Sequence, residues 1–192
     1  MERRENTIDL FDFTAQYGTV TEECAAIIVT NIVRSCLELY ERGIFHRDIK
    51  DENILLNPST LDTSIIDFGC ASQAASRDQC FRSFSGTPDY TAPEYFATGV
   101  LDQEKSTVWN IGCVMYILLF GEVPFQTKDH IVLGTLQMVS QSLLMSRDLT
   151  HNFKNNEIST QMADLLNDVF QVNPTKRLTF TALISRLAAF IQ

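Results

Sequence analysis

The chain has 192 residues, of which 45% are hydrophobic and 20% charged, and its formal net charge is −9. This composition is typical of a globular domain with a real core and excludes a disordered chain. The acidic balance argues against nucleic-acid binding, which needs Lys and Arg against phosphate, but an acidic surface can attract basic peptides. Acidity that serves solubility alone explains the composition equally well.

No targeting or membrane segment is predicted. The start, MERRENTIDLFDF, carries charges without a following apolar run, and the longest apolar run, IGCVMYILLF, stops at Gly121. The five cysteines are odd in number and form no CxxC pair, which favours a reducing compartment over a disulfide framework or a zinc site. We therefore expect a cytoplasmic protein, with the nucleus as a second location, that contacts neither membranes nor nucleic acid.

The first long helix is predicted in TVTEECAAIIVTNIVRSCLELYERG, residues 19–43. Thr19 and Glu22 form a capping-box pattern, apolar residues recur at helical spacing, and Gly43 ends the helix. The period then changes. NILLN and TSIIDF are short apolar runs bounded by turn residues, and they predict a small β-hairpin.

From Gly69 to Pro93 the sequence is polar and rich in small residues, and it predicts a long loop of the kind that is functional or disordered. Beyond it, STVWNIGCVMYILLFG is apolar nearly all round, which predicts a helix buried on every side. Three further helices are predicted in TKDHIVLGTLQM, STQMADLLNDVFQ and TFTALISRLAAFI. The expected architecture is a mostly helical lobe with one hairpin and one long loop near its edge.

The polar residues of HRDIKDEN, 46–53, carry the chemistry. Asp48 and Asn53 are expected on a short loop after a helix, and the hairpin would bring Asn53 close to Asp67. Amide and carboxylate oxygens are hard ligands suited to Mg²⁺ that also holds phosphate. Asp48 could orient a hydroxyl and accept its proton, while Lys50 neutralises charge on a transferring phosphoryl group. Any one of these residues alone would be better explained as a solvated loop charge.

The order HRD-x-K-x-x-N, then DFG at 67–69 and APE at 92–94, resembles the catalytic lobe of eukaryotic protein kinases. The resemblance covers residues 1–192, with 67–94 as the activation segment. Within that family it is closest to the Pim-type serine/threonine kinases, through ERRENTIDLFDF, HRDIKDENIL and VWNIGCVMYILLFGEVPF. It implies a mainly α fold, a kinase-like C-terminal lobe with a small β-hairpin.

The resemblance also implies a role for each matching residue, with ATP and Mg²⁺ as cofactors. Asp48 would be the catalytic base, Lys50 its phosphate-facing partner and Asn53 the third catalytic residue. Asn53 and Asp67 would be the metal ligands. The remaining residues would meet the adenine edge (Glu2, Arg3), floor the adenine pocket (Leu55), build the hydrophobic spine (His46, Phe68) and fix the peptide-binding loop through an ion pair (Glu94, Arg177).

Substrate choice is predicted from Lys50, from Thr87 and from a set of acids. Lys50 and Thr87 indicate serine/threonine specificity in the resemblance. Five acids flank the expected peptide groove and predict protein or peptide substrates rich in Arg and Lys: Asp9 and Asp12 in a first helix, Asp51, Glu52 and Glu122. Each alone could equally be an ordinary solvated charge, but converging carboxylates attract a guanidinium far more strongly.

Two features depart from the usual kinase pattern. Thr107 stands two residues before the Trp of the buried helix, where most kinases have an Asp; Pim-type kinases also lack that Asp. No GxGxxG or VAIK-like stretch occurs, so the sequence is expected to be a C-lobe that begins at the hinge without the N-terminal β-lobe.

Two functions therefore remain open. The first is a serine/threonine kinase whose fragment, as given, is inactive alone. The second is a catalytically inactive, kinase-derived module that binds peptides or partners. A partner could cover the face that the missing lobe would leave, where apolar surface is expected around His46, Leu55 and Phe68.

Overall fold

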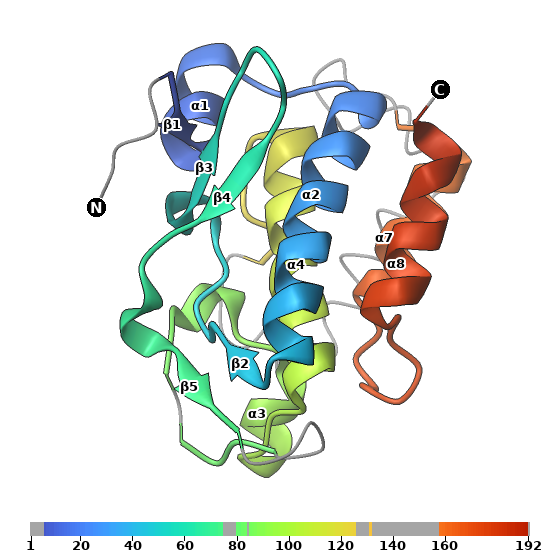
Figure 1. The fold of residues 1–192 in the computed structure, drawn as a ribbon. Helices are drawn as coiled ribbons and strands as arrows, with labels where there is room; N and C mark the ends of the chain where they lie inside the picture. Colours follow the sequence, from blue (N-terminus) through green and yellow to red (C-terminus); the bar gives the residue numbers. More distant parts are fainter. Residues whose placement is uncertain (1–5, 75–79, 84, 126–130, 132–157, 192) are drawn as a thin grey trace.

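The computed structural model describes residues 6–74, 80–83, 85–125, 131 and 158–191. In this part, α2 and α4 lie at the centre, α7 and α8 flank them on one side, and the small strands lie on the other (Figure 1). The predicted hinge residues Glu2 and Arg3, and the helix predicted at 127–138 apart from Ile131, lie outside the described residues. The described helices are α1 (Leu10–Tyr17), α2 (Glu22–Glu41), α3 (Pro93–Thr98), α4 (Gln103–Phe120), α7 (Thr160–Val169) and α8 (Phe180–Leu187).

Helix α2 confirms the first predicted helix, with a different cap. The predicted cap at Thr19 is wrong, because Thr21 Oγ1 accepts the hydrogen bond from the backbone N–H of Cys24 at 3.2 Å. Thr21 directly precedes the first helical residue, so its hydroxyl reaches a backbone N–H of the first turn. Gly43 takes a φ of +70° just beyond the helix, as its predicted stop role requires.

Helix α4 is the buried helix that the sequence predicts. Asp102 caps its start by accepting from the backbone N–H of Lys105 at 2.8 Å, and Gly121 ends it at a φ of +74°. At Gly112 an added Cβ would overlap the side chain of Val169, so the glycine lets α4 and α7 pack closely. Neither α4 nor any other described helix combines the length and the apolar composition that crossing a membrane would take.

The strands of the described residues form two small sheets. The predicted hairpin pairs β3 (Ile54–Leu56) with β4 (Thr63–Ile65), and the unpredicted β1 (Ile8–Asp9) adds to the other edge of β3. A second unpredicted pair joins β2 (Ile44–Phe45), just before the HRD stretch, to β5 (Ser72–Gln73), just after DFG. All three strand pairings are antiparallel. Together they bring the two motif-bearing loops to one side of the helical layer.

Candidate active site

The HRD stretch forms a tight loop that begins at a strand. It leaves β2 at Phe45 and leads into the 3₁₀ helix η1 (Asp51–Asn53), so the predicted loop follows helix α2 with the short strand β2 between them. Arg47 takes a φ of +68°, an uncommon conformation for a residue with a side chain. Its guanidinium donates to the carbonyl and hydroxyl of Ser83 and lies 4.4 Å over the ring of Phe81. The loop therefore holds the activation segment as well as the polar residues described next.

Asp48, the predicted base, has both carboxylate oxygens oriented. Oδ1 accepts from the backbone N–H of Thr87 at 2.9 Å and from its hydroxyl at 2.8 Å. Oδ2 accepts from the side-chain amide of Asn53 at 3.1 Å. The side chain is 12% exposed, so it faces solvent through a narrow opening. The predicted substrate-contact residue Thr87 thus lies directly against the predicted base.

Lys50 lies beside this carboxylate. Its ammonium is 3.9 Å from Asp48 Oδ2 and forms a closer ion pair with Glu52. The hydrogen bond to Glu52, with smaller contributions from the nearby carboxylates, raises the pKa of Lys50 despite its partial burial. The cation therefore stays charged at neutral pH at the position where the sequence predicts a phosphate-facing group.

Asn53 and Asp67 come to the same end of the hairpin, as predicted. The backbone N–H of Ile66, next to Asp67, donates to the carbonyl of Asn53 at 2.9 Å. The buried Asn53 uses its amide N–H groups on Asp48, which leaves its side-chain oxygen as an acceptor. Asp67 is exposed at a φ of +60°, and one of its oxygens accepts from the N–H of Gly69.

These two residues fit the donor set of a magnesium ion. Mg²⁺ is commonly bound through one or two protein oxygens together with substrate phosphates. No cluster of three or more His, Cys, Asp or Glu side chains with metal-binding geometry occurs among the described residues, so they provide no all-protein cage. Asn53 and Asp67 instead offer a partial set that nucleotide phosphates would complete.

His46 and Phe68 pack against each other as predicted, with their rings edge to face. Their ring centroids are 4.8 Å apart at an interplanar angle of 69°. His46 is only 4% exposed, so the apolar surface expected around these residues is formed by Phe68, at 45%, and by the half-buried Leu55. His46 Nε2 donates to the carbonyl of Ile66 at 2.9 Å, which leaves Nδ1 buried without a hydrogen-bond partner. Burial lowers the pKa of His46, against the opposing effects of this bond and of the nearby carboxylates.

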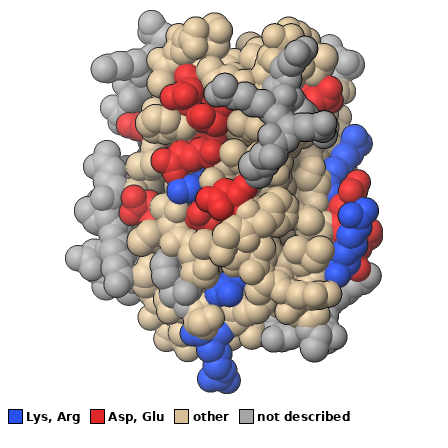
Figure 2. Space-filling model, turned by 60° about the vertical axis from the view of Figure 1, so that its left-hand side comes forward, with Lys and Arg blue, Asp and Glu red and all other residues tan. Residues whose placement is uncertain are grey.

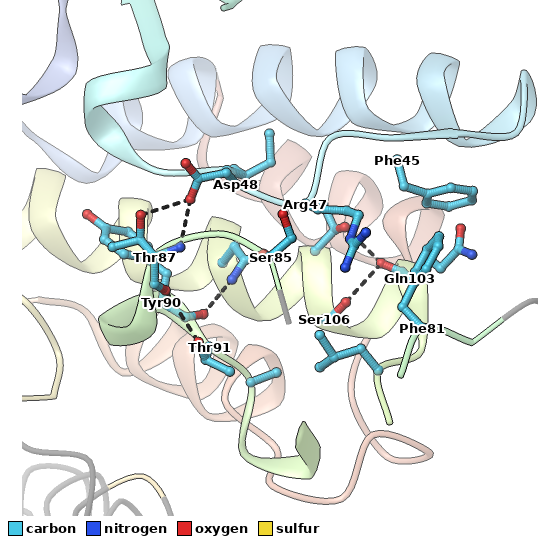
Figure 3. A pocket seen from close by; sticks show the side chains of 15 residues that line it. Phe45, Arg47, Asp48, Phe81, Ser85, Thr87, Tyr90, Thr91, Gln103 and Ser106 are labelled. Atoms are coloured by element: carbon cyan, nitrogen blue, oxygen red, sulfur yellow. Dashed lines mark hydrogen bonds between the residues drawn. The ribbon is translucent and has the colours of Figure 1, made fainter. Parts of the chain in front are cut away.

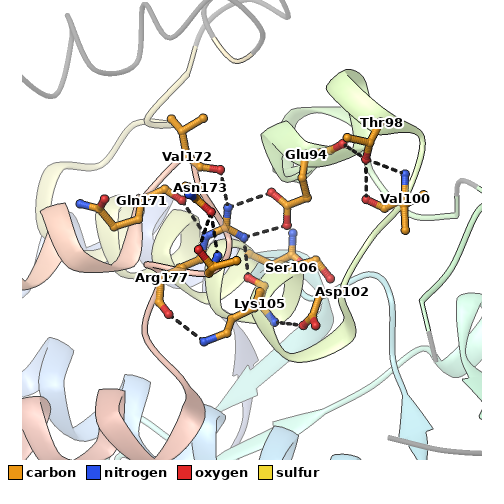
Figure 4. A network of polar contacts seen from close by, with 12 residues as sticks. Glu94, Thr98, Val100, Asp102, Lys105, Ser106, Gln171, Val172, Asn173 and Arg177 are labelled. Atoms are coloured by element: carbon orange, nitrogen blue, oxygen red, sulfur yellow. Dashed lines mark hydrogen bonds and ion pairs between the residues drawn. The ribbon is translucent and has the colours of Figure 1, made fainter. Parts of the chain in front are cut away.

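The predicted pair of Glu94 and Arg177 is formed (Figure 4), and both residues are buried. Two guanidinium nitrogens of Arg177 donate to the two oxygens of Glu94 at 2.9 and 2.8 Å. The remaining donor capacity goes to the carbonyls of Gln171, Lys105 and Val172, and the guanidinium lies 4.9 Å from the ring of Trp109. This network fastens the start of α3 to α4 and to the segment before α8.

A cavity of about 30 Å³ lies beneath the activation segment (Figure 3). Asp48 and Thr87 line one end, and Arg47 and Phe81 line the other. The wall from α4 is polar and includes Thr107, whose hydroxyl donates to the carbonyl of Gln103 at 2.8 Å. The hydroxyl of Thr107 therefore bonds within α4, and the small cavity lies between Thr107 and the catalytic loop.

The five predicted groove acids separate into different environments. Asp9 caps α1 rather than lying within it, because its carboxylate accepts from the backbone N–H of Asp12 at 2.8 Å. Asp51 is buried and is the clearest disagreement with a surface role. Asp12, Glu122 and Glu52 are exposed, with 53% of the Glu52 side chain accessible. Figure 2 shows acidic side chains gathered on the side of the molecule where β1 and β3 lie in Figure 1, with a basic side chain among them.

Sequence reasoning missed two residues of the site. Tyr90 donates from its hydroxyl to Asp51 Oδ1 at 2.7 Å, and an isolated Tyr between DFG and APE gave no signal for this. At Gly86, with a φ of +112°, an added Cβ would overlap the carbonyl of Arg47. A glycine directly before Thr87 was a usable signal, because only glycine permits both that φ and such a close approach.

Comparison with known proteins agrees with this geometry. The protein kinase domain family matches residues 1–187. The chain is 30% identical over 176 residues to serine/threonine-protein kinase cds1 of Schizosaccharomyces pombe, and 35% identical over 131 residues to serine/threonine-protein kinase pim-2 of Danio rerio. It is also 35% identical over 169 residues to serine/threonine-protein kinase PLK4 of Nematostella vectensis.

The chain therefore belongs to the protein kinase family. Its relatives are serine/threonine kinases of several kinds, of which pim-2 is one. The matches cover 89%, 68% and 88% of this chain, but only 37%, 42% and 16% of cds1, pim-2 and PLK4. The chain thus spans less than half the length of these relatives.

Proposed function

We propose that this chain is the catalytic lobe of an ATP-dependent serine/threonine kinase that phosphorylates Arg-rich peptides. The observation that carries the proposal is the Asp48 carboxylate, held from both sides by Thr87 and Asn53. A carboxylate fixed in this way, with Lys50 beside it, suits proton acceptance from an incoming hydroxyl.

In the proposed reaction, a substrate Ser or Thr hydroxyl oxygen attacks the γ-phosphorus of ATP and the bond to the ADP oxygen breaks. The hydroxyl proton passes to Asp48 Oδ2, the oxygen on the side of Lys50. Thr87, bonded to Oδ1, keeps the carboxylate in one orientation. The ammonium of Lys50 offsets negative charge on the phosphoryl group as it transfers.

Asn53 and Asp67 would hold Mg²⁺, which when bound would neutralise charge on the nucleotide phosphates. Asn53 is fixed by two hydrogen bonds to Asp48, so its oxygen is preorganised. Asp67 is kept in its left-handed conformation by the bond from Gly69. Because a carboxylate contributes charge as well as an oxygen, Asp67 is the principal ligand and Asn53 the secondary one.

The acidic face supports a preference for basic peptides. Glu52 is exposed at the catalytic loop, and α1, which carries Asp12, packs against η1. Paired carboxylates can bind a guanidinium in a bidentate manner, and such attraction weakens with added salt. The similarity to pim-2 is compatible with the Pim-type assignment, which remains part of this proposal.

Phosphate transfer from ATP and Mg²⁺ to an Arg-rich Ser/Thr peptide tests the proposal. The 192-residue chain is assayed alone and fused behind the N-terminal lobe of pim-2, each with Asp48 and with Asp48→Asn. We expect activity in the fusion, its abolition by Asp48→Asn, and little or none in the unfused chain. Full activity of the fused Asp48→Asn variant would remove Asp48 from its role. A fusion that binds the peptide without transferring phosphate would favour the binding-module alternative.

A further inference from the structure

A buried hydrogen bond that no assigned role accounts for joins the catalytic loop to the activation segment. The hydroxyl of Tyr90 donates to Asp51 Oδ1 at 2.7 Å. Asp51 is 5% exposed and Tyr90 8%, so the contact lies inside the molecule and not on the peptide-facing surface. Asp51 also accepts from the backbone N–H of Glu52 at 3.0 Å. An acid buried in this way is poorly placed to receive a guanidinium from solvent.

The bond runs parallel to the link that holds the proposed base. Asp48 accepts from Thr87, and Asp51, three residues later, accepts from Tyr90, three residues after Thr87. The first link ends on the carboxylate that receives the substrate proton, so it shares that group with the reaction. The second link ends on a carboxylate without a role in the reaction. It can therefore hold the segment in place throughout the catalytic cycle.

Tyr90 is itself anchored, which makes the link stiff. Its ring belongs to the hydrophobic core, and its carbonyl accepts from the side-chain amide of Asn110 on α4. Burial raises the pKa of the Tyr90 hydroxyl, so this group keeps its proton at neutral pH and acts as the donor. Hydrogen bonds to a carboxylate are among the stronger ones, and a low-dielectric interior strengthens them further.

We propose that Asp51 and Tyr90 are positioning residues whose hydrogen bond fixes Thr87–Tyr90 against the catalytic loop and so aligns the peptide substrate. Of the neighbouring acids Asp51 and Glu52, Glu52 alone then reads basic residues of the peptide. The peptide part of this inference, that the bond aligns the substrate and that Glu52 reads it, rests on the proposed function. The mechanical part, that the bond fixes Thr87–Tyr90 against the catalytic loop, does not.

Hydrogen–deuterium exchange of the 192-residue chain tests the mechanical part. Tyr90→Phe removes only the hydroxyl, whereas Asp51→Asn keeps an oxygen that accepts from Tyr90. We expect Tyr90→Phe to speed exchange in residues 85–92 about tenfold, the change expected from losing one hydrogen bond to a charged group. In Asp51→Asn the exchange rate of residues 85–92 should stay near that of the wild type. Tyr116→Phe, which makes the same change on α4, should leave the exchange rate of this segment unchanged.

Exchange rates in Tyr90→Phe, Asp51→Ala and the double variant distinguish loss of the hydrogen bond from a general loss of packing. Asp51→Ala also removes the acceptor of the Glu52 N–H, so it should speed exchange at least as much as Tyr90→Phe does. Adding Tyr90→Phe to Asp51→Ala should speed exchange no further, because the bond that the two residues share is already lost. If Asp51→Ala does not fold, the exchange rates of Tyr90→Phe and Asp51→Asn still test whether the hydrogen bond fixes this segment. Exchange in Tyr90→Phe equal to that in Tyr116→Phe would overturn the proposal.

Binding of a fluorescein-labelled Arg-rich peptide to the same variants tests the peptide part. Tyr90→Phe should weaken binding about fivefold while keeping the preference for Arg over Ala in the peptide. Glu52→Gln should reduce that preference, and Asp51→Asn should keep it. Loss of the preference in Asp51→Asn with unchanged exchange would mean that Asp51 itself reads the peptide, against the proposal. If wild type binds no Arg-rich peptide, the proposed function fails while the exchange arm still tests the link.

Discussion

Two sites in this molecule pair carboxylates with cations, but one pair is buried and the other is partly exposed to solvent. At Glu94 and Arg177, the Arg side chain is 0% exposed and the Glu side chain 8%, and the two are joined by two short hydrogen bonds. At the catalytic loop, Lys50 lies 3.9 Å from Asp48 and pairs more closely with Glu52, whose side chain is 53% exposed.

The difference lies in what remains unused. The donors of Arg177 are occupied by Glu94 and by backbone carbonyls, so the pair has no capacity for a ligand and acts as architecture. At the catalytic loop and the neighbouring DFG stretch, one oxygen of Asn53 and the exposed Asp67 carboxylate remain able to bind a ligand. The buried ion pair of Glu94 and Arg177 therefore acts as a structural joint, and the partly exposed charged residues of the catalytic loop form the reacting site.

Breaking the enclosed pair should give the largest loss of stability. Arg177→Met leaves the Glu94 carboxylate buried without its partner, which costs about 3–5 kcal/mol. Urea unfolding measures the change. The matched control is Arg186→Met, because Arg186 pairs with Asp168 where both side chains are 39% exposed, and such pairs contribute about 0–1 kcal/mol. Equal losses in the two variants would contradict the role of Glu94 and Arg177 as a structural joint.

Gly86→Ala should come next, because it forces the activation segment away from the catalytic loop. Strain at a φ of +112° costs about 1–3 kcal/mol, and the added methyl overlaps the carbonyl of Arg47. Phosphate transfer by the fused protein should also fall, since Thr87 would move off Asp48. Gly99→Ala is the control, at a φ of +67° with no atom within 4 Å of the new methyl. It should cost about 1 kcal/mol and spare activity.

His46 should make the stability depend on pH by a smaller amount. Its pKa is lowered in the folded state from 6.5, so the folded protein binds fewer protons and loses stability as pH falls below that value. Between about pH 7.5 and about pH 5.5 we therefore expect the free energy of unfolding to fall. His46→Gln keeps a donor for Ile66 and does not titrate, so its unfolding free energy should lack this loss. An identical pH profile in the variant would exclude His46 as the source.

Changing the open acid should have the smallest effect on stability. Asp67→Asn alters an exposed side chain and should shift the free energy of unfolding by no more than about 0.5 kcal/mol. In the fused protein, however, Asp67→Ala should weaken Mg²⁺-dependent nucleotide binding more than Asn53→Ala does. The reverse order, measured by titration calorimetry, would mean that the principal ligand has been misassigned.

The sequence predicted the parts of the fold that local chemistry decides. The apolar run around Trp109 specified α4, and the runs 53–57 and 63–68 specified the hairpin, because each pattern carries its own period. The HRD and DFG spacings located Asp48, Asn53 and Asp67 at one edge of the fold. The Glu94–Arg177 pair came from resemblance, since 83 positions separate its members.

What the sequence could not give depends on contacts between distant segments. The strand pair β2–β5 is only two residues long on each side, too short for a periodic signal. In the sequence, Asp51 cannot be distinguished from the exposed Glu52 beside it. In the fold, Tyr90 of the activation segment packs against Asp51 and donates a hydrogen bond to its carboxylate. A carboxylate in a polar loop does not reveal its exposure, because exposure is decided by whatever packs against it.

Asp48→Asn distinguishes a reacting carboxylate from a structural one, by phosphate transfer and urea unfolding measured on the same fused protein. Asn keeps an oxygen for Thr87 but cannot accept the hydroxyl proton at the other position. We predict that transfer to the Arg-rich peptide is abolished while the free energy of unfolding falls by about 1–2 kcal/mol, because the new amide N–H cannot accept from Asn53. Activity kept in full, or lost only together with several kcal/mol of stability, would place Asp48 with the structural joint of Glu94 and Arg177 and contradict the account.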